Sequence, residues 1–164
     1  QELLSAIENF NDIMFVMMKS NADSGGAAIN QYLQEYVDKH ANCKLFSSLR
    51  VEEYLALQKY SLGLIGNSSS GIVETPCFGI PTINIGDRQK GRLMADSIIN
   101  CNIDKNSICD AINKALSVEF REKAKNTVNP YGSGNTSYKI LKVIKDFISN
   151  SKINLKKEFY DIKF

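Results

Sequence analysis

Short apolar runs alternate with segments of helical periodicity along most of this chain, and this alternation restricts the folds open to it. The runs are short, as expected of strands buried on both faces, and lie at 13–18, 44–47, 62–66, 81–85 and 97–100. Apolar residues recur at helical spacing over 2–10, 29–39, 51–60, 104–115, 118–126 and 136–149. Short strands alternating with helices indicate βαβ units. The chain is therefore predicted to adopt an α/β fold, a Rossmann-like parallel sheet with helices on both faces.

Four loops follow the predicted strands directly and should lie along one edge of that sheet. They are 20–26, 47–50, 66–71 and 86–92. In sheets of this kind, ligands bind in the crevice beyond the carboxyl ends of the strands. We therefore look for functional residues in these loops.

The segment 66–92 carries the strongest indication of a ligand. It reads GNSSSGIVETPCFGIPTINIGDRQKGR, so an apolar run ends in serines and glycines and a short helical stretch follows. Ser68, Ser69 and Ser70 offer hydroxyls and unobstructed N–H groups at a helix start, which suit a phosphate or pyrophosphate. A serine at a helix start can equally cap the helix with no ligand present. The local sequence leaves both interpretations open.

Charged and polar residues around the serines extend the candidate site. Glu74 lies about one turn into the short helix, where it either benefits from the helix dipole or accepts hydrogen bonds from two vicinal hydroxyls, as on a ribose. Pro76 should shorten or bend that helix. Arg88 follows the next strand and can hold a phosphate, although a solvated loop is the commoner place for arginine. Asn21 follows the first strand and can contact a ligand, although a turn is its commoner role.

Composition excludes several classes of protein. The formal net charge of +2 over 164 residues gives no electrostatic footprint for nucleic acid or an anionic membrane. No apolar run approaches the roughly 20 residues that cross a bilayer, and the first residues lack the pattern of a signal peptide. Four widely spaced cysteines and a single histidine argue against a zinc site and favour a cytoplasmic protein with reduced thiols. We expect no metal, no cofactor, no nucleic acid and no membrane contact.

Several catalytic motifs are missing from the chain. The serine run lacks the G-x-S-x-G pattern of a hydrolase elbow, and the one histidine, His40, is far from it in sequence. The chain also has neither a G-x-x-x-x-G-K-[ST] phosphate loop nor a G-x-G-x-x-G dinucleotide turn. These absences disfavour a Ser-His-Asp hydrolase and a P-loop ATPase.

Taken in order, the motifs resemble those of the hydrolysing UDP-N-acetylglucosamine 2-epimerases of sialic acid biosynthesis. The matching stretches are SNADSG at 20–25, GNSSSG at 66–71, Glu74, FGIP at 78–81, NIGDRQKGR at 84–92, NPYGSG at 129–134 and Lys139-Ile140. They span nearly the whole chain. Two departures are the Pro76-Cys77 pair close to Glu74 and Ser133, where members of the family often have Asp.

The resemblance implies a two-domain enzyme of the GT-B arrangement, with the nucleotide sugar in the cleft between two Rossmann-like domains. This chain looks like the C-terminal half, with a UDP-binding domain over 1–149 and an arm over 150–164 that docks on the missing N-terminal domain. Ser68 and Ser69 would hold the diphosphate, Glu74 the ribose hydroxyls, and the main chain near Leu49 the base. Asn21 and Arg88 would complete the UDP site.

The resemblance also implies the reaction. UDP is eliminated from UDP-N-acetylglucosamine to leave a 2-acetamidoglucal, and water then adds to give N-acetylmannosamine. The catalytic groups of the family lie in the N-terminal domain, so none is assigned here and the chain alone should be inactive. The intact protein is expected to be a homo-oligomer.

Four alternatives stay open. The substrate can be UDP-N,N'-diacetylbacillosamine, on the route to legionaminic acid, or the enzyme can be a non-hydrolysing UDP-N-acetylglucosamine 2-epimerase. The chain can also be the nucleotide-binding domain of a GT-B glycosyltransferase, although the loop at 88–92 argues against this. A non-catalytic α/β binding domain is the fourth alternative.

Overall fold

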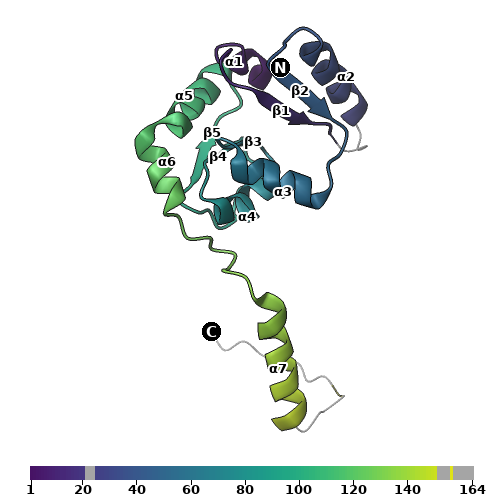
Figure 1. The fold of residues 1–164 in the computed structure, drawn as a ribbon, viewed down its shortest axis with the longest axis vertical. Helices are drawn as coiled ribbons and strands as arrows, with labels where there is room; N and C mark the ends of the chain where they lie inside the picture. The colour runs from purple at the N-terminus through teal and green to yellow at the C-terminus, as the bar shows by residue number, and fades with distance from the viewer. Residues whose placement is uncertain (21–24, 151–155, 157–164) are drawn as a thin grey trace. The chain divides into compact units, whose positions relative to one another are not determined.

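Parallel strands and helices alternate in the computed structural model, which describes residues 1–20, 25–150 and 156. Strands β1 (Phe15–Met18) and β2 (Cys43–Phe46) pair in parallel, with Phe15 opposite Cys43. A second parallel sheet has the order β3 (Leu64–Gly66), β4 (Thr82–Ile85) and β5 (Ile98–Cys101) (Figure 1). The predicted α/β fold with parallel strands is confirmed.

The described strands form two sheets where the sequence analysis expects one. In the part of the chain that the structure describes, β1 pairs with β2 only, so its other edge has no hydrogen-bonded strand. The four residues of β1 are accordingly half-buried, and not buried on both faces as the apolar run suggested.

The helices lie close to their predicted positions. They are α1 (Glu2–Ile7), α2 (Gly26–Val37), α3 (Val51–Tyr60), α4 (Ser70–Val73), the 3-10 helix η1 (Thr75–Phe78), α5 (Lys105–Leu116), α6 (Val118–Lys125) and α7 (Thr136–Asn150). Asp104 caps α5 by accepting a hydrogen bond from the Ser107 N–H at 2.8 Å, as its sequence position predicted.

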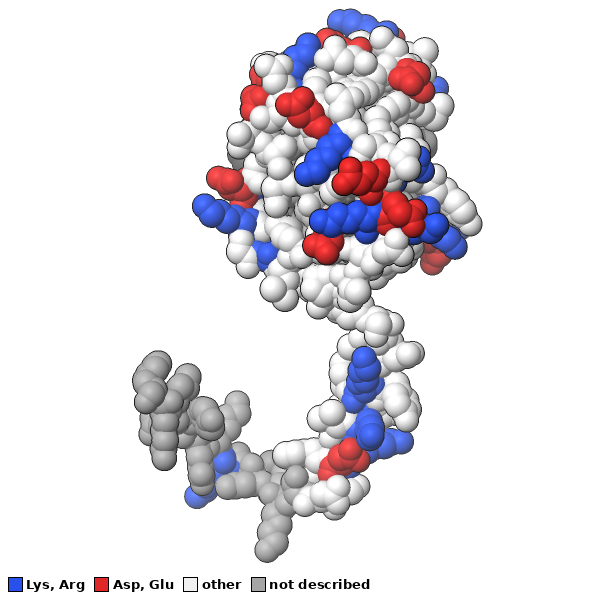
Figure 2. Space-filling view, turned by 90° about the vertical axis from the view of Figure 1, so that its left-hand side faces the viewer, with Lys and Arg blue, Asp and Glu red and all other residues white. Residues whose placement is uncertain are grey.

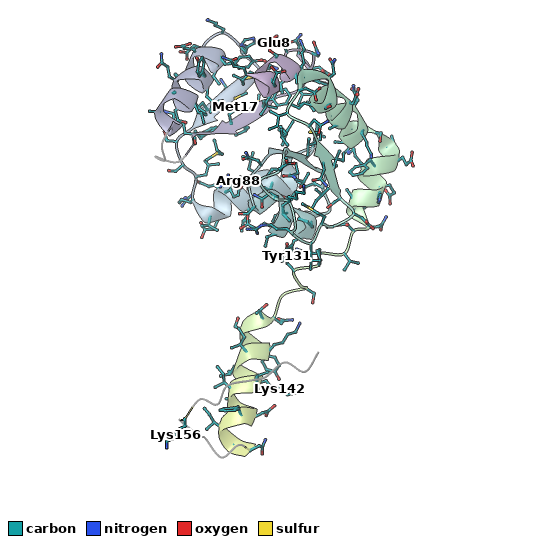
Figure 3. All side chains as sticks on the ribbon, turned by 180° about the vertical axis from the view of Figure 1, so that it is seen from behind. Glu8, Met17, Arg88, Tyr131, Lys142 and Lys156 are labelled. Carbon is teal, nitrogen blue, oxygen red and sulfur yellow. The ribbon has the colours of Figure 1, made fainter. Side chains whose placement is uncertain are left out.

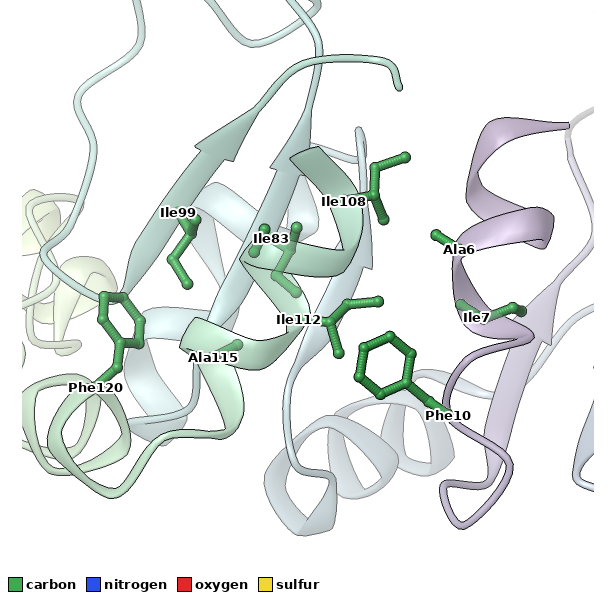
Figure 4. Packing of buried hydrophobic residues seen from close by; sticks show 10 residues of the cluster. Ala6, Ile7, Phe10, Ile83, Ile99, Ile108, Ile112, Ala115 and Phe120 are labelled. Carbon is green, nitrogen blue, oxygen red and sulfur yellow. The ribbon is translucent and has the colours of Figure 1, made fainter. Parts of the chain in front are cut away.

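The main core lies between α5, α1 and the second sheet. Its buried members are Ala6, Ile7, Phe10, Ile83, Ile99, Ile108, Ala111, Ile112, Ala115 and Phe120, and Figure 4 shows most of them facing one another. Full burial of an isoleucine such as Ile108 stabilises the fold by about 1.5–3 kcal/mol. The apolar stripe predicted for α5 is therefore what joins α1 to the sheet.

Opposite faces of the second sheet are covered by α5 and α4. On β4, Ile83 packs into the core cluster beside α5, while the adjacent Thr82 donates a hydrogen bond to the carbonyl of Gly71 in α4 at 2.9 Å. Successive side chains of a strand point to opposite faces, so the two helices lie on opposite sides of β4. This arrangement places α4 and the serine run beside the end of β3.

The chain divides into two compact units, Gln1–Tyr131 and Gly132–Phe164. The second unit contains α7, whose apolar side chains are exposed: Tyr138, Ile140, Leu141, Val143, Ile144, Phe147 and Ile148. The predicted domain of 1–149 thus extends beyond the first unit, and its boundary stays a prediction. Over the described residues, no helix combines the length and the apolar character needed to cross a membrane.

Candidate functional site

The serine loop and the cationic loop meet where β3 and β4 end. Gly66 pairs with Asn84 in the parallel register, so the two strand ends lie side by side. Gln89 is only 3% exposed, and its Nε2 donates a hydrogen bond to the main-chain oxygen of Asn67 at 2.8 Å. Arg88, labelled in Figure 3, reaches the Asn67 side-chain oxygen from Nη1 at 3.4 Å. Two of the four loops expected at one edge therefore touch.

The three serines have different surroundings. Ser68 and Ser69 are exposed, and Ser69, the N-cap residue of α4, makes no side-chain cap bond. Ser68 Oγ accepts a long hydrogen bond of 3.3 Å from the Ser70 N–H. Capping therefore occupies the Ser68 hydroxyl only weakly and the Ser69 hydroxyl not at all. Ser70 differs from the other two, because its hydroxyl proton is donated within the protein, to Glu74 Oε2.

The helix after the serines is short, as the sequence predicted. Helix α4 spans four residues, and η1 follows with Pro76 in its first positions. Pro76 lacks an N–H and cannot continue an α-helix, which confirms the expected shortening. A single turn has little macrodipole, so N–H groups and hydroxyls remain as the means of binding an anion.

Glu74 lies between α4 and η1 and is exposed. Its Oε2 accepts a hydrogen bond of 2.6 Å from Ser70 Oγ. The turn below it is held from a distant loop, because Asn129 Nδ2 donates to the Val73 carbonyl at 2.9 Å. Asn129 belongs to the NPYGSG motif, so a second matching motif supports the turn that presents Glu74.

A hydrogen-bond network on α3 supports Ser70 from behind. Tyr54 Oη and Gln58 Nε2 both donate to Ser70 Oγ, at 3.0 and 3.1 Å. Gln58 Oε1 in turn accepts from Thr75 Oγ1 at 2.8 Å. The sequence analysis missed these residues. Their only signal was the four-residue spacing of Tyr54 and Gln58, which places both on one face of a helix.

Leu49 lies in the loop between β2 and α3 and is half-buried. The next residue, Arg50, caps α3 and pairs with Glu53: its main-chain N–H donates to Glu53 Oε2 at 3.0 Å and its Nη2 to Oε1 at 2.7 Å. These hydrogen bonds hold the pKa of the Glu53 carboxyl below its ordinary value. Of the predicted site residues, Asn21 lies outside the described residues.

His40 and the cysteines have structural surroundings. The Nδ1 atom of His40 lies 2.7 Å from the Tyr36 carbonyl oxygen at the end of α2. The His40 imidazole also stacks on the Tyr36 ring, with 3.8 Å between the ring centroids. Burial raises the pKa of the Cys43 thiol. Within the described ranges, all four cysteines are free and no three acidic, cysteine or histidine side chains are grouped as metal ligands.

The face of the molecule drawn in Figure 2 carries charges of both signs. On the face shown in Figure 2, blue Lys and Arg side chains alternate with red Asp and Glu side chains. A hollow of about 350 Å³ lies beside β5 and α5 and is lined by residues such as Asn100, Asp110 and Lys114. None of the predicted site residues lines it; Ser68, Ser69 and Arg88 lie in the loops that follow β3 and β4.

The fold places this chain among α/β proteins with parallel sheets. Residues 1–145 match the model of the UDP-N-acetylglucosamine 2-epimerase family, and the chain belongs to that family. The polysialic acid biosynthesis protein P7 of Escherichia coli is 44% identical over 162 residues, which is 98% of this chain and 41% of that protein. The chain thus spans about two fifths of the length of this relative.

A second relative and a solved structure agree with this family. A GDP/UDP-N,N'-diacetylbacillosamine 2-epimerase (hydrolyzing) of Campylobacter jejuni is 44% identical over 121 residues, 73% of this chain and 31% of that protein. The crystal structure of UDP-GlcNAc 2-epimerase from Neisseria meningitidis bound to UDP-GlcNAc aligns with a TM-score of 0.70 and 19% identity, covering 88% of this chain and 40% of that one. At that identity, the structural likeness concerns the fold alone.

Proposed function

We propose that this chain is the UDP-binding part of a hydrolysing UDP-N-acetylglucosamine 2-epimerase. The observation that carries the proposal is the contact of the serine loop with the cationic loop through Asn67, next to the turn that presents Glu74. Hydroxyls, a guanidinium and a carboxylate thereby lie along one strand edge. That combination suits a nucleoside diphosphate, which has two phosphates and a vicinal diol.

Each predicted residue has a distinct part in the proposed site. Ser68 and Ser69 bind the diphosphate through their hydroxyls and N–H groups, and Arg88 adds a guanidinium, whose planar fork matches phosphate oxygens. Glu74 accepts hydrogen bonds from the ribose hydroxyls. The main chain near Leu49 meets the base, and Asn21 completes the site.

The proposed reaction has two stages. In the first, the proton on C2 of the sugar is removed and the bond from C1 to the UDP oxygen breaks, which leaves 2-acetamidoglucal and UDP. In the second, water adds across the double bond, with its hydroxyl at C1 and a proton at C2, to give N-acetylmannosamine. This chain would hold the departing UDP, whose negative charge Arg88 and the N–H groups stabilise. The proton transfers need groups outside this chain.

The rest of the enzyme would complete the site. We propose that α7, whose apolar side chains are exposed, and the arm 150–164 pack against an N-terminal domain of the GT-B type. We further propose a homo-oligomer in the cytoplasm that makes a sialic-acid-type sugar for a surface polysaccharide. Free cysteines fit a reducing compartment.

The second candidate substrate is UDP-N,N'-diacetylbacillosamine. It is favoured by the name of the Campylobacter relative, which has the same 44% identity to this chain as the Escherichia coli protein, over 121 residues in place of 162. Product analysis of the intact enzyme with each nucleotide sugar distinguishes the two by the free sugar that is released. Recovery of an epimerised UDP-sugar in place of free sugar would identify a non-hydrolysing enzyme.

Titration of the 164-residue chain with UDP tests the binding proposal. Amide shifts should move at 66–71 and 86–92, with a dissociation constant between high micromolar and millimolar, because the contacts of the other half are absent. Uridine serves as the control ligand, since it lacks the phosphates that Ser68, Ser69 and Arg88 would bind. Unmoved amides over 66–71 at several millimolar UDP would refute the proposal, as would equal affinity for uridine.

A further inference from the structure

We propose that Tyr54, Gln58 and Ser70 are positioning residues that fix the Glu74 carboxylate for the ribose hydroxyls of the nucleotide. The inference rests on the proposed function, since it assumes that a nucleotide binds at this edge. It goes further by assigning to α3 a role in discriminating a ribonucleotide from its 2′-deoxy analogue.

The hydrogen bonds around Ser70 leave its hydroxyl a single orientation. A serine hydroxyl has one proton and two acceptor lone pairs. Tyr54 Oη and Gln58 Nε2 donate to Ser70 Oγ at 3.0 and 3.1 Å and occupy both lone pairs. The one proton therefore points to Glu74 Oε2 at 2.6 Å. Hydrogen bonds in such a chain polarise one another and strengthen the last bond, which goes to the carboxylate.

The Gln58 side chain, which donates to Ser70, is itself fixed by burial. Gln58 is 3% exposed and Thr75 is 0% exposed. Thr75 Oγ1 donates to Gln58 Oε1 at 2.8 Å, so the amide oxygen is used and its nitrogen faces Ser70. A buried side-chain amide is costly to leave unpaired. The buried hydrogen bond to Thr75 therefore fixes the orientation of the Gln58 amide, whose nitrogen donates to Ser70 Oγ.

The carboxylate that accepts the hydrogen bond from Ser70 belongs to an exposed side chain. Glu74 lies at the surface between α4 and η1, where a glutamate without such a contact samples several rotamers. One bond to Oε2 leaves Oε1 and a further lone pair of Oε2 for two vicinal hydroxyls. Ordering the carboxylate before the ligand arrives removes part of the entropy loss of binding.

The same helix connects two parts of the proposed site. Helix α3 begins at Val51, directly after the loop that contains Leu49, and its Tyr54 and Gln58 contact Ser70. The loop proposed for the base therefore adjoins α3, and the carboxylate proposed for the ribose is linked to α3 through Ser70. This connection explains how the two can keep a fixed spacing along a nucleoside.

Ribose discrimination by the 164-residue chain is the quantity to measure. It is the dissociation constant of 2′-deoxy-UDP divided by that of UDP, from amide-shift titrations. We expect a ratio of about 10 for the wild type, because a hydrogen bond to a charged group gives at least about that factor. Glu74→Ala should lower the ratio to about 1. Tyr54→Phe and Ser70→Ala should each lower it about threefold, while leaving the affinity for pyrophosphate unchanged.

Two controls separate positioning from general destabilisation. Tyr60→Phe makes the same chemical change on the same helix. The Tyr60 ring is exposed and lies beside the Lys59 ammonium, so this variant should leave the ratio unchanged. In a Glu74→Ala background, Ser70→Ala should change the ratio no further. Without ligand, three-bond couplings of Glu74 should report averaging about χ1 in Tyr54→Phe and Ser70→Ala but not in Tyr60→Phe.

The possible failures are distinguishable. If UDP does not bind the wild type, the proposed function falls and this inference falls with it. If Glu74→Ala keeps the ratio, UDP binds without reading the ribose through Glu74, and only this inference is overturned. If Glu74→Ala lowers the ratio to about 1 but Tyr54→Phe and Ser70→Ala both leave it at the wild-type value, the network serves the fold alone. The positioning role is then refuted.

Discussion

Replacing Gly71 with alanine tests how the serine run is held on its sheet. A Cβ atom added at Gly71, in α4, would lie 2.8 Å from Thr82 Cγ2 and 3.1 Å from Leu64 Cδ2. Thr82 is 1% exposed on the central strand β4, and its Oγ1 already donates a hydrogen bond to the Gly71 carbonyl. The new methyl group would therefore meet the buried Thr82 side chain, which has little space to move into, and the end of the half-buried Leu64 side chain.

The magnitude follows from two opposing effects. Overpacking a well-packed site costs about 1–3 kcal/mol. Gly71 does not have a positive φ, so alanine fits its backbone and stabilises by about 0.4–1 kcal/mol through the unfolded chain and helix propensity. The clash is the larger effect. We expect a net loss of about 1–2 kcal/mol in the free energy of unfolding, and a fall in Tm of about 3–8 °C.

Urea unfolding followed by circular dichroism measures this loss, with Thr82→Ser as the partner mutation. Serine lacks Cγ2 but keeps the hydroxyl that bonds to Gly71, so it removes the closer of the two contacts. In the Thr82→Ser background the cost of Gly71→Ala should fall by about half, because the Leu64 contact remains. The reasoning is refuted if Gly71→Ala is as stable as the wild type, or if its cost is the same in both backgrounds.

Two further predictions concern pH and thiol chemistry. Hydrogen bonds from Ser107 lower the pKa of Asp104, so this carboxylate stabilises the fold above its unfolded pKa and the contribution is lost as pH falls through the lower, folded value. Asp104→Asn, which retains a capping side chain, should flatten the acid side of the stability curve between about pH 5 and pH 2; an unchanged slope in urea unfolding would contradict this. Cys77 is exposed, whereas Cys43 is buried with a raised pKa. Because the thiolate is the reactive form, peptide mass spectrometry should find Cys77 labelled by a maleimide well before Cys43 at neutral pH, and equal rates would contradict this assignment.

The secondary structure was largely predictable because its signals are local. The predicted helix at 136–149 appears as Thr136–Asn150, and the predicted strand at 97–100 as Ile98–Cys101. Periodic apolar residues and a capping aspartate determine such elements within one window of sequence. The division into two sheets was not predictable in this way, because it depends on which strand edges pair across the chain.

The contacts that hold the candidate site were not predictable from the local pattern. Gln89 lies in a charged loop, yet it is buried because its amide bonds to the main chain of Asn67, 22 residues earlier. Tyr54 and Gln58 act on Ser70 across 16 and 12 residues. From local sequence alone, a polar side chain in a loop or on a helix is interpreted as solvent-exposed, because its hydrogen-bond partner is distant in sequence. The sequence could therefore suggest candidate ligand-binding residues, but not the residues that support them.

The serine run shows most directly why the structure was needed. The local sequence offers three consecutive hydroxyls with no difference between them, and only the family resemblance singled out Ser68 and Ser69. The structure uses Ser70 for Glu74 and leaves Ser68 and Ser69 exposed. A hydroxyl has a single proton, so Ser70 cannot donate to a phosphate and to Glu74 at the same time. In the proposed site the diphosphate must therefore be bound by Ser68 and Ser69. Adjacent serines then contact the phosphate directly and the ribose through Glu74.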